Sequence, residues 1–320
     1  MIDISVVIPY YNESSTIKTT LNLIEGQTYK PKEVVFVNSS STDDSSEIID
    51  LWIERQSTHN KIRFLNINSD SATPSSSKNI GIKNSNYEWI AFMDCGLIFR
   101  KNWLEGLAKQ LKEHDFKPSI VSGVCRLHGY TVFDMCAVAH TYGVGTNRVC
   151  IPGSIVNRTV FDSTGLFIDN MRASYDRAWQ KKTQDLNISR VSPKKNNVSY
   201  IGINYSPSFI HLAKKVSIYS RPAVYLKNYQ IPKLYLLYMF SSILLIAFHF
   251  WAGVTNIVFY LIFRGYLIPI VKSCKYKVIF TRIEAILLLP IVGITIDLSR
   301  FHGYIFGYSS RIVKYLLKYD

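Results

Sequence analysis

The stretch at residues 4–13 places a buried strand directly before a polar loop. It reads Ile-Ser-Val-Val-Ile-Pro-Tyr-Tyr-Asn-Glu, and its first five residues are β-branched or small, as a buried parallel strand requires. We expect Pro9 to stop the strand and a helix to begin near Ser15. In open α/β sheets, ligands bind at such carboxyl ends of strands. The opening of the chain therefore predicts a binding site beside residues 10–13.

Hydrophobic periodicity predicts an α/β domain. Strands are expected near residues 4–9, 33–37, 62–66, 89–93 and 119–124, and helices near 15–26, 44–56, 76–84, 102–113, 159–164 and 174–184. This alternation implies a mostly parallel sheet that is covered by helices on both faces.

Polar motifs follow the predicted strands in a fixed order. Along the chain they are residues 38–45 (Asn-Ser-Ser-Ser-Thr-Asp-Asp-Ser), 77–81 (Ser-Lys-Asn-Ile-Gly), 94–96 (Asp-Cys-Gly), 102–104 (Asn-Trp-Leu), 152–154 (Pro-Gly-Ser) and 175–176 (Tyr-Asp). Three of these motifs carry carboxylates, which the chemistry of a catalytic site would need.

In order and spacing, these motifs resemble those of family 2 of the glycosyltransferases, over roughly residues 3–185. The resemblance implies the GT-A fold, a Rossmann-like and mostly parallel sheet, and an enzyme that transfers a sugar from a nucleotide donor. The sequence departs from the family pattern at several positions. Asn38 and Ser39 stand where two aspartates are usual, Lys78 replaces an arginine, Gly96 replaces the second acid of an Asp-x-Asp metal motif, and Tyr175 replaces a glutamate.

The resemblance also implies a metal ion and a donor site. Asp94 is expected to hold one Mg²⁺ or Mn²⁺ together with the donor diphosphate and water, since these ions prefer carboxylate and phosphate oxygens. The alternative is that Asp94 is a turn or helix-capping residue, and that Lys78 belongs to a solvated helix face. The donor-binding residues implied are Pro9, Tyr11, Glu13, Asn38, Lys78, Asn79 and Asp94.

Asp176 is the candidate general base. It matches the second residue of the family's Glu-Asp pair, and a carboxylate there would take the proton of the acceptor hydroxyl. The alternative is an aspartate in the first turn of a helix, stabilised by the helix dipole. Asp169 is the second candidate for the base.

Charge is distributed unevenly along the 320 residues. Residues 194–320 hold 16 of the 37 basic residues but three of the 23 acidic ones, so most of the net charge of +14 lies there. A nucleic-acid-binding protein would carry such charge on its folded domain. Here the charge accompanies apolar segments, which indicates a membrane surface with anionic lipid and no nucleic-acid partner.

The C-terminal part predicts membrane-anchoring helices. Residues 234–263 carry no charged side chain, and Gly265 to Val271 are apolar again. About 20 residues span a bilayer, so this region predicts two short helices with a hairpin near residues 252–253, or one spanning and one interfacial helix. Lysines and arginines on both sides favour the hairpin, with both ends in the cytosol. A third segment at 285–296 is expected to be interfacial or re-entrant, and the tail from Arg311 a basic amphipathic helix.

Together these features predict a GT-A domain at residues 1–195, a juxtamembrane connector at 196–233 and membrane-anchoring helices with a basic tail at 234–320. We expect an inverting glycosyltransferase at the bacterial inner membrane, with its catalytic domain in the cytosol. Its acceptor would be lipid-linked or otherwise membrane-associated, in the assembly of a surface polysaccharide. The alternatives are a polyprenyl-phosphate sugar synthase and an inactive scaffold of a polysaccharide assembly complex.

Overall fold

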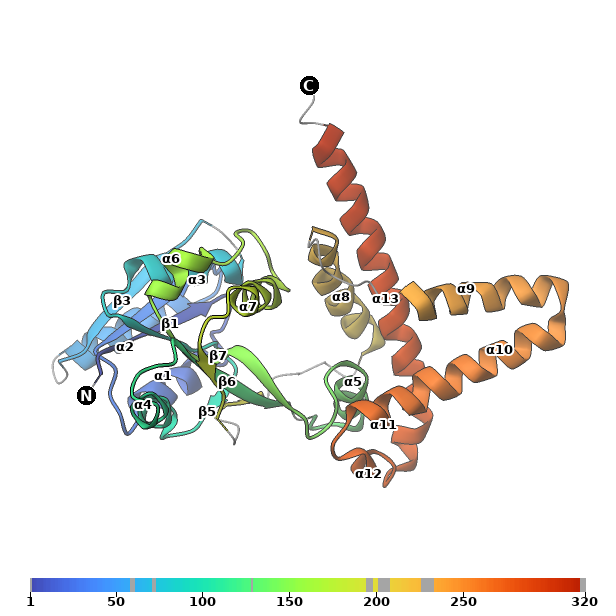
Figure 1. Cartoon of the computed structure of the whole chain (residues 1–320), viewed down its shortest axis with the longest axis horizontal. Coiled ribbons are helices and arrows are strands. Elements are labelled where there is room, and N and C mark those ends of the chain that lie inside the picture. The colour runs from blue at the N-terminus through green and yellow to red at the C-terminus, as the bar shows by residue number, and fades with distance from the viewer. Residues whose placement is uncertain are drawn as a thin grey trace. The chain divides into compact units, whose positions relative to one another are not determined.

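A computed structural model describes residues 2–57, 61–70, 73–127, 129–193, 198–200, 208–225 and 233–316 (Figure 1). The chain divides into two compact units. Unit 1 comprises Met1–Arg126 with Asn147–Gly202, and unit 2 comprises Leu127–Thr146 with Ile203–Asp320. Residues 127–146 therefore group with the C-terminal helices, although they lie inside the range 1–195 predicted as the catalytic domain.

The strands of unit 1 form one mixed sheet. The described strands are β1 (Ile4–Tyr10), β2 (Glu33–Asn38), β3 (Arg63–Asn68), β4 (Trp89–Phe92), β5 (Ile98–Phe99), β6 (Ile120–Leu127), β7 (Asn147–Asn157), β8 (Arg190–Val191) and β9 (Val198–Tyr200). Their order is β3-β2-β1-β4-β7-β6-β9-β5, with β8 beside β6. The pairs among β1 to β4 are parallel, and β7 is antiparallel to both β4 and β6. The predicted mostly parallel sheet is confirmed, with an antiparallel addition.

Helices cover both faces of this sheet (Figure 1). The helices α1 (Ile17–Glu25), α2 (Ser45–Ser57) and α4 (Trp103–Glu113) bury apolar side chains in one core with alternate residues of β1, β2 and β4. On the other face lie α3 (Pro74–Asn84), α6 (Thr159–Thr164) and α7 (Tyr175–Asp185). There, the rings of Phe161, Phe167 and Trp179 pack on one another, and the first two also pack on Phe92 of β4. The six predicted helices of this unit are all present.

Two residues set how β1 meets its neighbours. Gly81 of α3 lies so close to Val7 that any side chain would collide with it, so α3 packs tightly on the strand. Pairing of β1 with β4 ends at Val7, whereas pairing with β2 continues to Tyr10. The expectation that Pro9 stops the strand is wrong. Pro9 lies where pairing with β4 has already ended, so its missing N–H costs no hydrogen bond.

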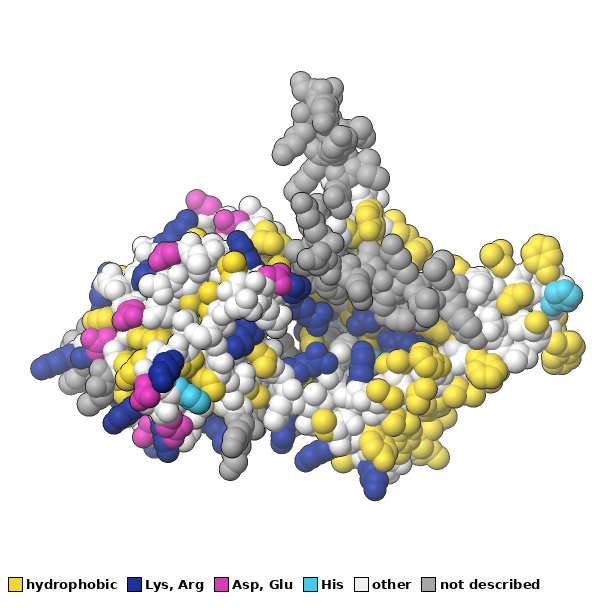
Figure 2. Space-filling model, in the orientation of Figure 1, with side chains coloured by type: hydrophobic (Ala, Val, Ile, Leu, Met, Phe, Trp, Pro, Cys, Tyr) yellow, Lys and Arg dark blue, Asp and Glu magenta, His cyan; other side chains and the backbone are white. Residues whose placement is uncertain are grey.

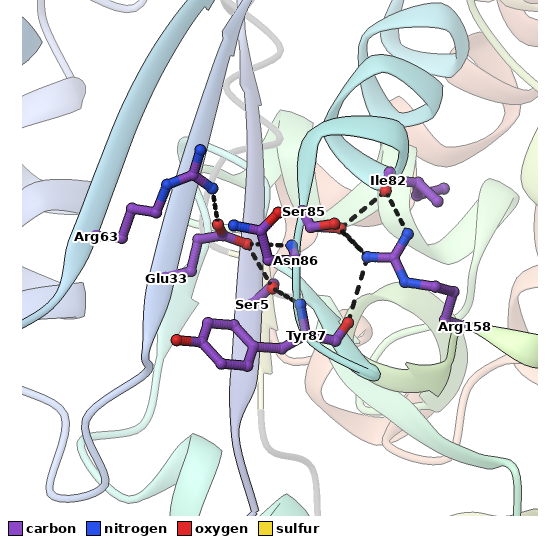
Figure 3. Close-up of polar contacts among 8 residues, drawn as sticks. All are labelled: Ser5, Glu33, Arg63, Ile82, Ser85, Asn86, Tyr87 and Arg158. Atoms are coloured by element: carbon purple, nitrogen blue, oxygen red, sulfur yellow. Dashed lines mark hydrogen bonds and ion pairs between the residues drawn. The ribbon is translucent and has the colours of Figure 1, made fainter.

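A polar network fixes the loop between α3 and β4 (Figure 3). Buried Glu33 accepts hydrogen bonds from Ser5 Oγ (2.6 Å) and the Asn86 amide (2.8 Å), and it pairs with Arg63. From the other side, Arg158 donates to the carbonyls of Ile82, Ser85 and Tyr87. The Arg158 guanidinium therefore holds the carboxyl end of α3, where a cation also complements the helix dipole.

Unit 2 is helical in its described residues. It contains α5 (Val132–Thr141), α8 (Phe209–Ser220), η1 (Arg221–Tyr225), α9 (Lys233–Phe248), α10 (Phe250–Ile262), the π-helical turn η2 (Phe263–Leu267), α11 (Ile268–Lys272), α12 (Tyr276–Ile279) and α13 (Ile283–Leu316). The predicted segment at 285–296 is part of this 34-residue α13. Residues 196–197, 201–207 and 226–232 of the predicted connector, and 317–320 of the predicted tail, lie outside the described residues.

The helices α9 and α10 pack against each other and meet at His249, close to the predicted hairpin at 252–253. Gly253 of α10 is in such close contact with Ile246 of α9 that a side chain would collide with it. Phe248 and Trp251 at this turn are 79% and 78% exposed. Among the described residues, one helical stretch, Phe250–Lys272, is long and apolar enough to cross a membrane. Figure 2 shows hydrophobic side chains gathered on the surface of unit 2.

A buried polar network joins four helical elements of unit 2: α5, α10, η2 and α13. Arg264 of η2 donates two hydrogen bonds to Asp297 of α13 (2.6 and 2.8 Å), and Tyr260 donates a third (3.0 Å). The remaining guanidinium nitrogen lies 2.5 Å from Nδ1 of His140, whose Nε2 lies 2.6 Å from the Leu289 carbonyl. Every polar group of this network has a partner, which is the condition under which such groups can be buried.

Candidate functional site

Charged side chains from four segments of unit 1 meet beyond the carboxyl ends of β1 and β4. Glu13 follows β1, Lys78 lies in α3, Asp94 follows β4, and Tyr175 and Asp176 begin α7. This edge of the sheet is where open α/β folds bind ligands. The sequence named Glu13, Lys78, Asp94 and Asp176 as site residues, and their roles in binding and catalysis stay predictions.

An ion pair lies at the centre of this cluster. Lys78 Nζ donates to Asp94 Oδ1 at 2.6 Å and to the Tyr175 hydroxyl at 3.2 Å. The Lys78 side chain is completely buried, while the Asp94 side chain is 31% exposed. The alternative of a solvated surface lysine is therefore excluded. Asp94 presents one carboxylate oxygen that this ion pair does not occupy.

Electrostatics keep Lys78 protonated. Burial alone would lower the pKa of Lys78, but the charge of Asp94 and the hydrogen bonds to Asp94 and Tyr175 raise it above its ordinary value. Burial raises the pKa of the Tyr175 hydroxyl to about 12, although the Lys78 ammonium opposes this. The lysine therefore stays protonated and the tyrosine stays neutral at any physiological pH.

Glu13 lies in the same electrostatic field. Burial raises the pKa of its carboxyl group, the hydrogen bond from Thr16 opposes this, and the negative charges of Asp94 and Asp43 raise it further. Its backbone N–H donates to Ser45 Oγ at 2.8 Å, which fixes the loop after β1. Glu13 thus lies in the field of Asp94. Because both carboxylates are negative when ionised, a closer approach of Glu13 to Asp94 would cost electrostatic free energy.

Tyr11 is 42% exposed at the tip of the same loop. The guanidinium carbon of Arg172 lies 5.7 Å from the centre of its ring, within cation–π distance. Sequence reasoning named Tyr11 but missed Arg172, because no motif marks the segment between Phe167 and Tyr175. The sequence offers only the turn-forming residues Asn170 and Ser174 on either side of Arg172. In the structure both adopt a positive φ and shape a tight loop.

Asp176 lies in the first turn of α7, one residue after the tyrosine that contacts Lys78. The charges of both Asp94 and Asp176 raise the pKa of the partly buried Cys150 thiol, after the larger effects of its neighbour Cys125 and of desolvation. The two aspartates therefore act on one small region. The structure is compatible with both interpretations of Asp176, as a base and as a first-turn helix residue.

Asn79 uses its whole amide to hold a loop. Its Nδ2 donates to the Phe167 carbonyl and to Asp169 Oδ1, both at 2.8 Å, and its Oδ1 accepts from the Phe167 amide at 3.0 Å. Asp169, the second candidate for the base, is therefore hydrogen-bonded from one side. Asn79 positions the segment that leads to α7, and its predicted contact with the donor stays a prediction.

Asn38 and Ser39 end β2 with local hydrogen bonds. Asn38 donates to Asn68 Oδ1 (3.0 Å) and accepts from the Ser41 amide (2.8 Å). Ser39 Oγ lies 2.7 Å from Ser77 Oγ. These contacts stabilise the loops after β2 and β3, and Asn38 is almost fully buried.

The residues near Asp94 do not fit a divalent metal ion held by the protein. Among the described residues, no group of three or more His, Cys, Asp or Glu side chains could hold a metal. Gly96, at the second position of the expected metal motif, offers no ligand, and one Asp94 oxygen already accepts from the Lys78 ammonium. Hard divalent cations need several oxygen ligands, and this donor set supplies few.

Comparisons with known proteins agree with this architecture. The family described as "Glycosyl transferase family 2" matches residues 5–135. Glycosyltransferase GlyG of Streptococcus pneumoniae is 33% identical over 112 residues, which are 35% of this chain and 36% of that protein. Poly-beta-1,6-N-acetyl-D-glucosamine synthase of Staphylococcus epidermidis is 32% identical over 96 residues, 30% of this chain and 22% of that protein. The chain thus spans about a third or less of the length of these relatives.

Among solved structures, the mannosyltransferase PcManGT from Pyrobaculum calidifontis, in complex with GDP-Man and Mn²⁺, matches with a TM-score of 0.55. It is 17% identical, and the match covers 96% of this chain and 89% of that one. At this identity the likeness shows the fold alone, which is GT-A. The sequence match at residues 5–135 and the fold agree: this part of the chain is similar to family 2 of the glycosyltransferases.

Proposed function

We propose that this chain is an inverting glycosyltransferase that moves a sugar from a nucleoside diphosphate to a hydroxyl group of a membrane-associated acceptor. The observation that carries the proposal is the cluster of Glu13, Lys78 and Asp94 at the carboxyl edge of the sheet, with Asp176 directly after the tyrosine that accepts a hydrogen bond from Lys78. Charged side chains are costly to gather and partly bury, so such clusters are typical of functional sites.

In the reaction, the acceptor oxygen attacks the anomeric carbon of the sugar from the face opposite the diphosphate. The bond between this carbon and the phosphate oxygen breaks, and its electron pair leaves with the nucleoside diphosphate. Asp176 takes the proton of the acceptor hydroxyl as the new bond forms, which is the role of a general base. Configuration at the anomeric carbon is inverted because attack and departure occur on opposite faces.

The donor would bind between the loop after β1 and the segment before α7. The exposed Tyr11 ring, with Arg172 beside it, offers a face on which a nucleotide base can stack. The Glu13 carboxylate can accept a hydrogen bond from a ribose hydroxyl or a base N–H. Asn79 would act indirectly, by holding the segment from Phe167 to Asp169 in place.

Unit 2 supports a membrane location for the acceptor. Its described surface exposes large apolar side chains, among them Phe248, Phe250, Trp251, Phe259, Ile262 and Val271. Lys272, Lys275, Lys277 and Arg282 follow the apolar stretch, as expected beside anionic lipid on the cytosolic side. We therefore propose a lipid-linked acceptor, a catalytic domain in the cytosol and a role in surface polysaccharide synthesis.

A binding screen tests the enzymatic part. The purified full chain in detergent is mixed with UDP- and GDP-linked sugars, and its thermal unfolding is followed. A donor that binds the folded state should raise the unfolding temperature in proportion to its occupancy. The donor that shifts the protein is then incubated with membrane lipid extract to look for a glycosylated lipid. Absence of any shift with every nucleotide sugar would favour an inactive scaffold.

A further inference from the structure

We propose that Lys78, by neutralising Asp94, takes the place of a divalent cation, so that the site binds a nucleoside diphosphate without a metal ion. This inference rests on the proposed function, because it concerns how the same site accepts the donor diphosphate. It differs from the metal-dependent site expected from the sequence.

The geometry of Lys78 is that of a built-in cation. Its ammonium group is completely buried and lies 2.6 Å from Asp94 Oδ1. A second hydrogen bond, to the Tyr175 hydroxyl at 3.2 Å, fixes its direction. Moving the ammonium group away would break both of these hydrogen bonds. We therefore expect it to stay beside Asp94 whenever the site is folded.

The charge balance of the site argues against a tightly bound metal. With Lys78 in place, the pair of Lys78 and Asp94 is electrically neutral, so it attracts a divalent cation weakly. The Glu13 carboxylate is close enough to Asp94 for the charge of Asp94 to raise its pKa. One oxygen of Glu13 already accepts a hydrogen bond from the Thr16 hydroxyl. A metal ion bound to Asp94 would also be repelled by the Lys78 ammonium group, which is bound to the same carboxylate.

Two neutral residues complete this arrangement. Tyr175 gives Lys78 an uncharged hydroxyl, where a carboxylate would compete with Asp94 for the ammonium. Gly96 adopts a φ of +74°, and a Cβ atom built on it would have no neighbour within 4 Å. Asp is among the residues that tolerate positive φ, so an aspartate could be placed at this position without a clash.

The open space at Gly96 provides a gain-of-function test. In the wild-type full chain, Mn²⁺ alone should give the electron paramagnetic resonance spectrum of free Mn²⁺, and UDP or GDP should bind equally well in excess EDTA and in Mn²⁺. Gly96→Asp adds a second carboxylate and should immobilise Mn²⁺ without nucleotide. The Lys78→Met variant leaves the Asp94 carboxylate without its cation. The affinity of this variant for UDP or GDP in EDTA should therefore fall at least about tenfold below that of the wild-type chain, and it should recover when Mn²⁺ is added.

Matched variants separate this role from a structural one. Lys83→Met removes an exposed lysine from the same helix and should change neither metal nor nucleotide binding. Lys78→Arg keeps the charge and should keep nucleotide binding in EDTA. If Lys78→Met does not fold, Gly96→Asp and the wild-type chain still carry the test.

The outcomes distinguish this inference from the proposed function. Immobilised Mn²⁺ on the wild-type chain, or nucleotide binding that is lost in EDTA, would overturn the inference and leave the glycosyltransferase intact. Binding of neither nucleotide under either condition would refute the proposed function, and this inference with it. Equal nucleotide affinity in EDTA and Mn²⁺, together with Mn²⁺ gained by Gly96→Asp, supports both.

Discussion

A side chain whose polar atoms are already hydrogen-bonded inside the protein has few atoms left to contact a ligand. Lys78 and Asn79 are adjacent in α3, yet both spend their polar groups inside the protein, one on Asp94 and Tyr175 and the other on residues 167–169. Asp176 and the second oxygen of Asp94 keep capacity for a ligand. The sequence predicts which residues gather here, but it cannot show these partners, because they come from distant segments.

The general base is testable by one substitution. Asp176→Asn keeps the size of the side chain but cannot take a proton, so turnover should fall by at least about 10²-fold while donor affinity is retained. Turnover and donor dissociation constant are measured on the same preparation. Asp185→Asn is the control, since Asp185 lies in the same helix in an exposed pair with Lys181 and should stay within about twofold. Full activity of Asp176→Asn would move the role to Asp169.

The site also predicts a loss of stability in alkali. The folded-state pKa values of Lys78 and Tyr175 both lie above their ordinary values of 10.5 and 10.0, so the folded chain binds more protons than the unfolded chain in alkali. Their contribution to the free energy of unfolding is therefore complete below pH 10 and is lost as the pH rises above it. Chemical denaturation across this range should show a steeper decline for the wild-type chain than for Lys78→Met, and parallel curves would contradict the assignment.

Among the elements, α3 connects the most distant parts of unit 1. Gly81 packs it on β1, Arg158 holds its carboxyl end, and Asn79 fixes the segment before α7. The Ser77–Gly81 motif therefore combines packing with positioning. Its glycine is explained by contact with Val7, a reason that the sequence pattern alone does not contain.

Removal of one amide in α3 should disturb the segment that carries the candidate bases. Asn79→Ala loses three hydrogen bonds and leaves the Phe167 amide unpaired, so we expect a destabilisation of about 2–3 kcal/mol and a lower kcat/KM. Denaturant unfolding and steady-state kinetics measure the two effects. Asn84→Ala is the matched control, because the exposed side chain of Asn84 donates to the Ile80 carbonyl of its own helix and makes no other hydrogen bond among the residues that the structure describes. Equal effects of the two changes would argue against a positioning role for Asn79.

The elements that were missed have physical reasons. The strand β7 contains Pro152 and Gly153, and its pairing with β6 shifts register between Val121 and Gly123, so neither strand nor turn pattern is regular. In α5, Phe133 to His140 are all buried, so no 3.6-residue alternation of polar and apolar residues marks the helix. Helices with one solvent-facing side were predicted closely because they carry a periodic pattern, and the fully buried strands β1, β2 and β4 because each contains a short apolar run that ends in a polar turn.

At the scale of the whole molecule, residues 127–146 belong to unit 2, although in the chain they lie between two parts of unit 1. Arg126 and Asn147, at the two ends of this segment, are register partners in the β6–β7 pair. Residues 127–146 are therefore a long excursion from an ordinary antiparallel hairpin. A domain boundary read from composition alone cannot detect it, since the segment is short and lies far upstream of the apolar helices.

This excursion changes the expected outcome of a truncation. A chain that ends after residue 200 keeps β9 and α5 but lacks α11 and α13, so the apolar face of α5 would be exposed and the protein should aggregate. A chain that also replaces residues 127–146 with a short glycine-containing turn should be monomeric, because Arg126 and Asn147 already face each other. Light scattering of the two purified proteins measures the difference. Equal solubility of both would show that α5 does not need unit 2.

The same excursion imposes an order on biosynthesis. The helix α5 leaves the ribosome long before α13, whose Asp297 and Leu289 complete the contacts of Arg264 and His140. At about 5–20 residues per second, roughly 140 intervening residues take on the order of ten seconds. During this interval a mostly apolar helix follows a strand of the nascent catalytic domain with none of its final partners. A nascent chain that pauses before residue 283 should therefore be bound by chaperones or held at the membrane surface, and its sheet should be complete before its helical unit is.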